Sequence, residues 1–185
     1  TDMYRVHDPL SAKEVRRRLE ELLNLVNLPV RVLNSYPHEL SGGQLQRVSI
    51  AASLMHDPPF VVLDEATTAL DVITQGQILK EIRNLKEKLQ VTWLLITHDI
   101  SVVSACCEQI VVMYAGRMME YGTVEQVIHR PSHPYTRGLL QSFPTLHGEK
   151  ANLRGIPGAM PDLSAKPEGC VFASRCPQAR EECRK

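Results

Sequence analysis

Two acidic residues and a histidine stand after short apolar runs. Asp64 and Glu65 follow Phe60–Leu63, and His98 comes shortly after Thr92–Ile96. Such runs predict strands buried on both faces, and the carboxyl ends of parallel strands meet at one edge of a sheet. There one carboxylate can hold Mg²⁺ while its neighbour polarises water, and a histidine can stabilise a terminal phosphate. The plainer interpretation is a solvated turn with a capping histidine.

A second candidate site lies before a helical pattern. Ser41, Gly42, Gly43 and Gln44 precede apolar residues at helical spacing, namely Leu45, Val48, Ala52 and Met55. A serine here predicts an ordinary helix N-cap. The same stretch also suits an anion, because a helix N-terminus presents unpaired N–H groups and glycines let a phosphate approach the backbone.

Regular elements are expected around both sites. A capping box at Ser11–Glu14 predicts a helix that ends before Pro29, and periodicity predicts another over 72–90. A short helix after Asp99 and a third strand at 110–114 complete a strand-helix alternation. This alternation predicts an α/β fold with a parallel sheet.

Composition limits the possible functions. The 185 residues are 43% hydrophobic, and Lys+Arg and Asp+Glu both number 21, so no net charge favours nucleic acid or anionic lipid. The basic residues 16–18 lie among glutamates, which favours a solvated helix face. No run reaches the length of a membrane span, and the first ten residues lack a signal-peptide pattern.

The five cysteines do not suit a disulfide scaffold. Their number is odd, and no secretion signal accompanies them. Cys106 and Cys107 lie among apolar residues and are expected in a core.

The ordered motifs resemble those of ABC-type ATPases. Leu40–Gln44 resembles the signature motif, Phe60–Glu65 the Walker B strand, Ala69–Asp71 the D-loop, and His98 the switch histidine. The resemblance implies a P-loop NTPase fold, here partial: a helical subdomain and the second half of a mostly parallel RecA-like sheet. It also implies ATP and Mg²⁺ as cofactors.

The resemblance assigns a role to each residue. Asp64 would bind Mg²⁺ through water, Glu65 would polarise the attacking water, and His98 would contact the γ-phosphate. In this family two ATPase subunits pair head-to-tail. Ser41, Gly42, Gly43 and Gln44 would therefore grip ATP held by the partner, and Asp71 would reach across the same interface.

One family motif has no counterpart here. A phosphate loop of the form G-x-x-x-x-G-K-[ST] needs a Gly-Lys pair, and none of the ten glycines precedes a lysine. The chain is therefore expected to be part of a longer one, and by itself to be unable to bind ATP tightly or turn it over. We expect a helical subdomain at 1–57, a RecA-like core at 58–130 and a C-terminal extension at 131–185.

The C-terminal extension narrows the resemblance. Arg130–Leu140 resembles the oligopeptide and dipeptide importer ATPases, a branch in which C-terminal cysteines bind an iron–sulfur cluster. Cys170, Cys176 and Cys183 would then be ligands of a [4Fe-4S] cluster that still lacks a fourth thiolate. Zinc is the rival metal, and unligated thiols remain an alternative.

The resemblance implies an ATPase subunit that powers peptide import. Its partners would be a second ATPase subunit, membrane permease subunits and, indirectly, an extracytoplasmic solute-binding protein, with no nucleic acid. It would lie on the cytoplasmic face of the membrane, peripherally. The alternatives are a soluble ABC ATPase of DNA repair or translation, and a non-catalytic metal-binding module.

Overall fold

The computed structural model describes residues 11–68, 70–142, 155–164 and 168–184. The chain forms two compact units, residues 1–106 and 107–185. The expected division at 57 and 130 is a different partition, and it stays a prediction.

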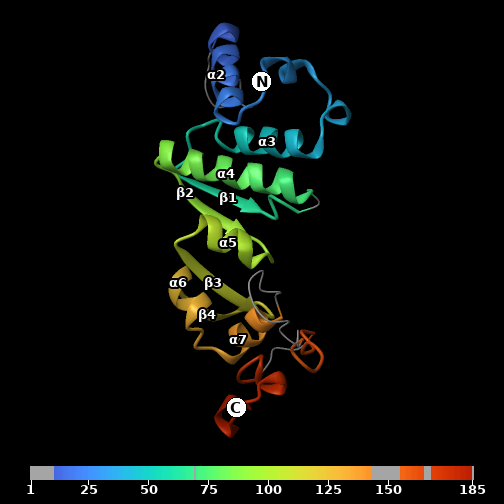
Figure 1. Cartoon of the computed structure of the whole chain (residues 1–185), viewed down its shortest axis with the longest axis vertical. Coiled ribbons are helices and arrows are strands. Elements are labelled where there is room, and N and C mark those ends of the chain that lie inside the picture. The colour runs from blue at the N-terminus through green and yellow to red at the C-terminus, as the bar shows by residue number, and fades with distance from the viewer. Residues whose placement is uncertain (1–10, 69, 143–154, 165–167, 185) are drawn as a thin grey trace. The chain divides into compact units, whose positions relative to one another are not determined.

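The first unit contains helices α2 to α5 and two strands (Figure 1). In chain order they are α2 (Ala12–Leu25), η1 (Val30–Asn34), η2 (Pro37–Glu39), α3 (Gly42–Ser53), β1 (Phe60–Asp64), α4 (Val72–Lys88), β2 (Thr92–Ile96) and α5 (Ile100–Cys106). The expected capping box starts α2, since Ser11 accepts from the Glu14 N–H and the Glu14 carboxylate accepts from the Ser11 N–H. The α-helices and strands of this unit agree with the sequence pattern to within a few residues, whereas η1 and η2 were not predicted.

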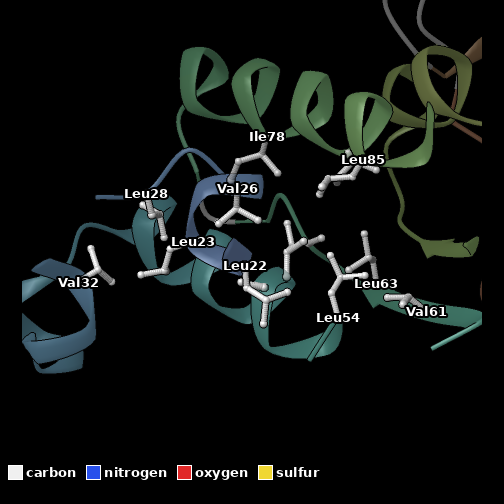
Figure 2. Packing of buried hydrophobic residues seen from close by; sticks show 14 residues of the cluster. Leu22, Leu23, Val26, Leu28, Val32, Leu54, Val61, Leu63, Ile78 and Leu85 are labelled. Carbon is white, nitrogen blue, oxygen red and sulfur yellow. The ribbon is translucent and has the colours of Figure 1, made fainter. Parts of the chain in front are cut away.

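One apolar core joins the helices to the strands of this unit. Figure 2 shows Ile78 and Leu85 of α4 pointing towards Val26, Leu54 and Leu63. All five side chains are buried. Residues of α2, η1, α3, β1 and α4, with the turns between them, therefore share one core.

Strands β1 and β2 are parallel, as predicted, but only one face of the pair is buried. Val61 and Leu63 of β1 are 4% and 6% exposed, whereas Phe60 and Val62 are 50% and 48% exposed. On β2, Leu94 and Ile96 are also exposed. The prediction of burial on both faces is wrong for the described residues, because an apolar run does not reveal what covers each face.

The third strand does not pair with the first two in the described part of the chain. β3 (Gln109–Tyr114) pairs antiparallel with β4 (Arg117–Thr123), and β1 pairs with β2. Ala115 and Gly116 both have positive φ, 49° and 74°, as a tight two-residue hairpin turn requires. The local turn thus makes β4 an antiparallel neighbour of β3, and the expected parallel neighbour of β3 is not seen among the described residues.

The second unit continues with α6 (Val124–His129), α7 (Pro134–Gln141), η3 (Ala173–Arg175) and η4 (Glu181–Arg184). A smaller aromatic core gathers Tyr114, Tyr135 and Phe172, with ring centroids 4.7–5.3 Å apart. Arg175 joins this core to the backbone by donating to the carbonyls of Ile156 and Pro157. In the described ranges, no helix combines the length and apolarity needed to cross a bilayer.

Candidate functional site

Glu65 and His98 lie together at the carboxyl ends of the parallel strands, as predicted. The register pairs Asp64 with Ile96, so Glu65 and His98 each come just after the paired segment. Glu65 Oε1 lies 2.9 Å from His98 Nδ1. Both side chains are accessible, 41% and 76% exposed. The sheet edge thus presents a carboxylate and an imidazole to solvent as one unit.

Each partner favours the charged form of the other. The Thr68 hydroxyl donates to the second oxygen of Glu65, and this bond, followed by that from His98, lowers the pKa of Glu65. The hydrogen bond and charge of Glu65 in turn raise the pKa of His98. Glu65 is therefore ionised at neutral pH. The contact of Thr68 with Glu65 was not predicted, although the position of Thr68 three residues after Glu65 is a usable signal.

Glu65 has an unusual backbone conformation. Its φ is +51°, a left-handed conformation that a non-glycine residue seldom adopts. The Glu65 N–H donates to the carbonyl of Ile96 at 2.9 Å, which extends the bonding between the two strands by one step. Backbone strain of this kind costs on the order of 1–3 kcal/mol and clusters at functional sites.

His98 is fixed from the other side by the start of α5. Asp99 accepts from the N–H and hydroxyl of Ser101 at 2.8 and 2.6 Å, and from Gln75 of α4 at 3.1 Å. The Asp99 N–H donates to the Thr97 hydroxyl at 3.1 Å. These bonds hold the backbone on both sides of His98, so the position of the imidazole does not depend on Glu65 alone.

Asp64 is the last residue of β1 and is exposed at the same edge. Its oxygen donors suit Mg²⁺, which proteins bind through one or two carboxylates together with substrate phosphates and water. The described residues contain no group of three or more His, Cys, Asp or Glu arranged to hold a metal by themselves. Asp64 is therefore a candidate ligand for Mg²⁺ at this edge of the sheet.

The Ser41 stretch begins α3, as expected. Ser41 accepts from the Gln44 N–H at 3.3 Å, and the Gln44 side chain accepts from the Ser41 N–H at 2.9 Å. Ser41 is exposed. The plainer interpretation as an N-cap is thus correct, and it is compatible with anion binding because the hydroxyl and the first-turn N–H groups lie at an open helix end.

The two glycines of this stretch also serve packing, which the sequence analysis did not anticipate. A Cβ on Gly43 would lie 2.6 Å from the methyl group of Thr74, and one on Gly42 would lie 3.3 Å from Leu70 Cδ2. The first turn of α3 therefore packs directly on the start of α4. No residue larger than glycine fits at position 43 without displacing Thr74.

Asp71 caps α4 at this contact. Its Oδ1 accepts from the N–H groups of Ile73 and Thr74 at 3.1 and 2.9 Å, and its Oδ2 accepts from the Thr74 hydroxyl at 2.6 Å. The hydroxyl bond from Thr74 is the largest cause that lowers the pKa of Asp71. Thr74 thus connects Gly43 on one side with Asp71 on the other.

The C-terminal cysteines do not form a metal site in the described residues. The Cys170 N–H donates to the Cys183 carbonyl at 2.8 Å, and Cys170 and Cys176 pack against the aromatic core. Nevertheless, these three cysteines are not placed as a ligand group within the described ranges. The iron–sulfur and zinc predictions therefore gain no support from the described residues. Cys106 and Cys107 are partly buried rather than fully buried core residues.

Two protein-family profiles match this chain, one in its N-terminal part and one in its C-terminal part. Residues 2–68 match the ABC transporter family profile, and residues 119–183 match the C-terminal region of oligopeptide/dipeptide transporters. The oligopeptide transport ATP-binding protein AppD of Bacillus subtilis is 43% identical over 99% of this chain and 56% of its own length. OppD of Haemophilus influenzae, with the same description, is 46% identical over 88% of this chain and 51% of its own. The chain spans about half the length of the curated relatives it matches.

Solved structures of ABC ATPases are also similar to this chain. The ATP-binding cassette MJ0796, in a dimer bound to ADP and Pi, is 36% identical with a TM-score of 0.55, covering 62% of this chain and 49% of that one. CbiO1 of Clostridium perfringens, part of the ABC transporter complex CbiONQ, is 32% identical with a TM-score of 0.61, covering 69% and 51%. The fold is that of a partial ABC ATPase cassette. Motif order, site geometry and these relatives together place the chain in the ABC transporter ATP-binding family, in its oligopeptide/dipeptide transporter branch.

Proposed function

We propose that this chain supplies the signature helix and the hydrolytic edge of an ATPase subunit that powers import of peptides or related solutes. The observation that carries the proposal is the 2.9 Å contact between Glu65 and His98 at the ends of two parallel strands. The peptide-transport relatives support the choice of cargo class.

Glu65 is suited to orient the attacking water. Its carboxylate is held ionised, and an ionised oxygen accepts a hydrogen bond from water. The lowered pKa makes it a weak proton acceptor, so its contribution is polarisation and alignment of the water rather than early proton removal. Mg²⁺ brought with ATP would be held by Asp64 and would neutralise charge on the phosphate oxygens.

His98 is suited to the terminal phosphate. Its Nδ1 is engaged by Glu65, which leaves Nε2 as the nitrogen that can donate to a ligand. The raised pKa increases the fraction of imidazolium, and a cation stabilises the negative charge on the γ-phosphate. Glu65 would therefore align the attacking water and also hold the His98 imidazole in position to contact the phosphate.

The signature stretch would act on a second subunit. Ser41, Gly42, Gly43 and Gln44 form an open helix start, and the neighbouring Asp71 is exposed beside it. In a head-to-tail pair these residues would close over ATP bound by the partner subunit. Hydrolysis would remove the phosphate that bridges the two surfaces and let the pair open. Permease subunits and a peripheral position on the cytoplasmic face of the membrane follow from the same proposal, with a solute-binding protein acting indirectly.

The test uses a longer ATPase subunit that carries this chain together with a phosphate loop. Glu65→Gln should leave ATP binding and ATP-driven dimerisation intact and reduce turnover by at least about a hundredfold, the loss typical when a catalytic group is removed. Steady-state phosphate release and size-exclusion chromatography with ATP measure the two effects. Glu87→Gln, an exposed site on α4, is the matched control and should turn over normally. Near-wild-type hydrolysis by Glu65→Gln would contradict the proposal.

The soluble-ATPase alternative makes a different prediction. A subunit that works on nucleic acid or ribosomes would copurify with those components, whereas an importer ATPase copurifies with integral membrane proteins. Affinity purification of the longer subunit from detergent-solubilised membranes separates the two cases.

A further inference from the structure

A charged side chain is buried in the middle of the first unit. Glu81 of α4 is 8% exposed, and it is the only acidic or basic residue among the buried residues of the described part of the chain. Burial raises the pKa of Glu81. A buried carboxylate is costly unless a cation and hydrogen-bond donors compensate it. An apolar residue would serve a merely structural role at this position with less penalty.

Arg47 of α3 provides the compensating charge. Its Nε lies 3.0 Å from Glu81 Oε2, and the two side chains are only 17% and 10% exposed. The contact is ionic rather than a well-formed hydrogen bond, since Glu81 Oε2 has no hydrogen-bond partner among the described residues. Arg47 also donates from Nη2 to Gln77, one turn earlier on α4, at 3.4 Å. The guanidinium therefore contacts two successive turns of α4.

A third element reaches the same carboxylate. Asn27, which follows α2, donates from Nδ2 to Glu81 Oε1 at 3.4 Å. Glu81 is thus the point at which α2, α3 and α4 are connected by polar contacts. Apolar contacts in the surrounding core are non-directional, whereas these contacts specify one register between the helices.

The Arg47 side chain and the first turn of α3 contact the same helix, α4. Arg47 is one helical turn after Gly43, and Gly43 packs against Thr74, which in turn hydrogen-bonds Asp71. α3 and α4 are therefore fixed to each other at two levels. A single contact would allow one helix to rotate about it, but two contacts a turn apart do not.

We propose that Arg47 and Glu81 are positioning residues that hold α3 and α4 as one rigid body. Their ion pair sets the spacing between Ser41, at the start of α3, and Asp71, at the start of α4. Both residues must meet the same partner surface at the same time for the nucleotide to be enclosed. The inference rests on the proposed function, because it concerns how the signature helix and the D-loop are presented to a second subunit.

The test separates positioning from stability by a double substitution. Arg47→Met combined with Glu81→Leu removes both charges and replaces them with apolar groups, a change that is often neutral or stabilising for a buried pair. In the longer ATPase subunit we expect the thermal midpoint of this variant to match wild type. We expect kcat to fall between about tenfold and a hundredfold, as small misplacements of reacting groups do. ATP-driven dimerisation should weaken while ATP affinity of the monomer stays unchanged.

Two further variants keep the test informative if the double variant folds poorly. Arg47→Lys keeps the charge but loses the two-turn contact, so it should fold normally and show an intermediate kcat. Arg16→Met with Glu20→Leu is the matched control: this pair has the same 3.0 Å separation but is exposed, and kcat should not change. Wild-type kcat and dimerisation in both the double variant and Arg47→Lys would overturn the inference.

The two proposals fail in distinguishable ways. If Glu65→Gln retains wild-type turnover, the proposed function fails. If Glu65→Gln is inactive but the Arg47 and Glu81 variants hydrolyse ATP and dimerise like wild type, only the positioning inference fails. Parallel loss of kcat and thermal midpoint in the variants, with both restored together in the apolar double variant, would show a structural role instead and also overturn it.

Discussion

At the scale of single residues, Glu65 combines two features. It contacts the other candidate catalytic side chain, and its backbone has a left-handed conformation. Its two oxygens have different partners, Thr68 and His98, and its backbone N–H bonds to Ile96. The positive φ of Glu65 is maintained by these contacts. Function and backbone conformation at this residue can be separated experimentally.

The first prediction concerns the titration of His98. Because Glu65 raises the pKa of His98, NMR titration of its imidazole should give a midpoint above the ordinary value of 6.5. Glu65→Gln should move the midpoint back towards 6.5. His98→Gln assigns the resonance among the seven histidines. An unchanged midpoint in Glu65→Gln would show that the contact is absent in solution.

The pKa shifts of Glu65 and His98 determine how the stability of the fold changes with pH. The raised pKa of His98 means that its contribution to stability is complete below 6.5 and is lost as pH rises through the folded-state value. The lowered pKa of Glu65 means that its contribution is present above 4.5 and is lost as pH falls through its folded-state value. Both groups are exposed, so the effect on the free energy of unfolding is small.

A second prediction tests the strain at Glu65. Alanine and glycine both remove the side-chain contacts, but only glycine tolerates a φ of +51° without steric cost. Glu65→Gly should therefore be more stable than Glu65→Ala by about 1 kcal/mol. At Arg83, exposed in the interior of α4, the order should reverse by about the same amount. Chemical denaturation of the four variants measures both differences. Equal stability of the two Glu65 variants would argue against the left-handed backbone.

At the scale of elements, β1 has one buried face and one exposed face. Its neighbours Val61 and Val62 have the same side chain and the same strand context, but they are 4% and 48% exposed. The contacts of Val61 with the core under α4 distinguish them. A comparison of these two residues therefore isolates the energy of burial.

Alanine substitutions at these positions should differ by about 2 kcal/mol. Val61→Ala removes buried methyl groups and leaves a cavity, whereas Val62→Ala removes groups that are already half solvated. The loss of strand propensity is common to both, so it cancels in the comparison. Urea denaturation of this chain gives the two free energies of unfolding. If Val62→Ala were the more costly substitution, the assignment of the buried face would be wrong.

At the scale of the whole molecule, each unit has an exposed apolar sheet face. In the first unit it comprises Phe60, Val62, Leu94 and Ile96, and in the second Val111, Met113, Met118 and Tyr121. Cross-strand pairing makes both faces contiguous, since Val62 lies opposite Leu94 and Val111 opposite Tyr121. Contiguous exposed apolar patches promote association.

We therefore expect this 185-residue chain to self-associate as its concentration rises. Val62→Lys with Leu94→Glu places opposite charges on paired positions of the first face, and Met113→Lys with Met118→Glu does so on the second. The combined variant should remain monomeric in sedimentation velocity at concentrations where wild type does not. Identical concentration dependence of the two proteins would exclude these faces as the cause.

The sequence alone determined the α-helices and strands of the first unit and their order. Apolar periodicity, the capping box at Ser11, the N-cap at Ser41 and the strand ends at Asp64 and Ile96 are local signals, so the helices and strands of the first unit and the meeting of Glu65 with His98 could be predicted. The ordered motifs also sufficed to identify the family. Each of these features depends on residues close in the chain or on a parallel pairing that follows from the alternation of strands and helices.

The tertiary structure alone decided which surfaces meet. An apolar run does not state which of its faces is covered, and this is why burial of β1 on both sides was predicted wrongly. The roles of Gly43 against Thr74 and of Arg47 against Glu81 join residues about thirty positions apart, on helices whose relative rotation no local pattern fixes. Side-chain packing between helices sets that rotation, because it depends on the shapes of both surfaces at once.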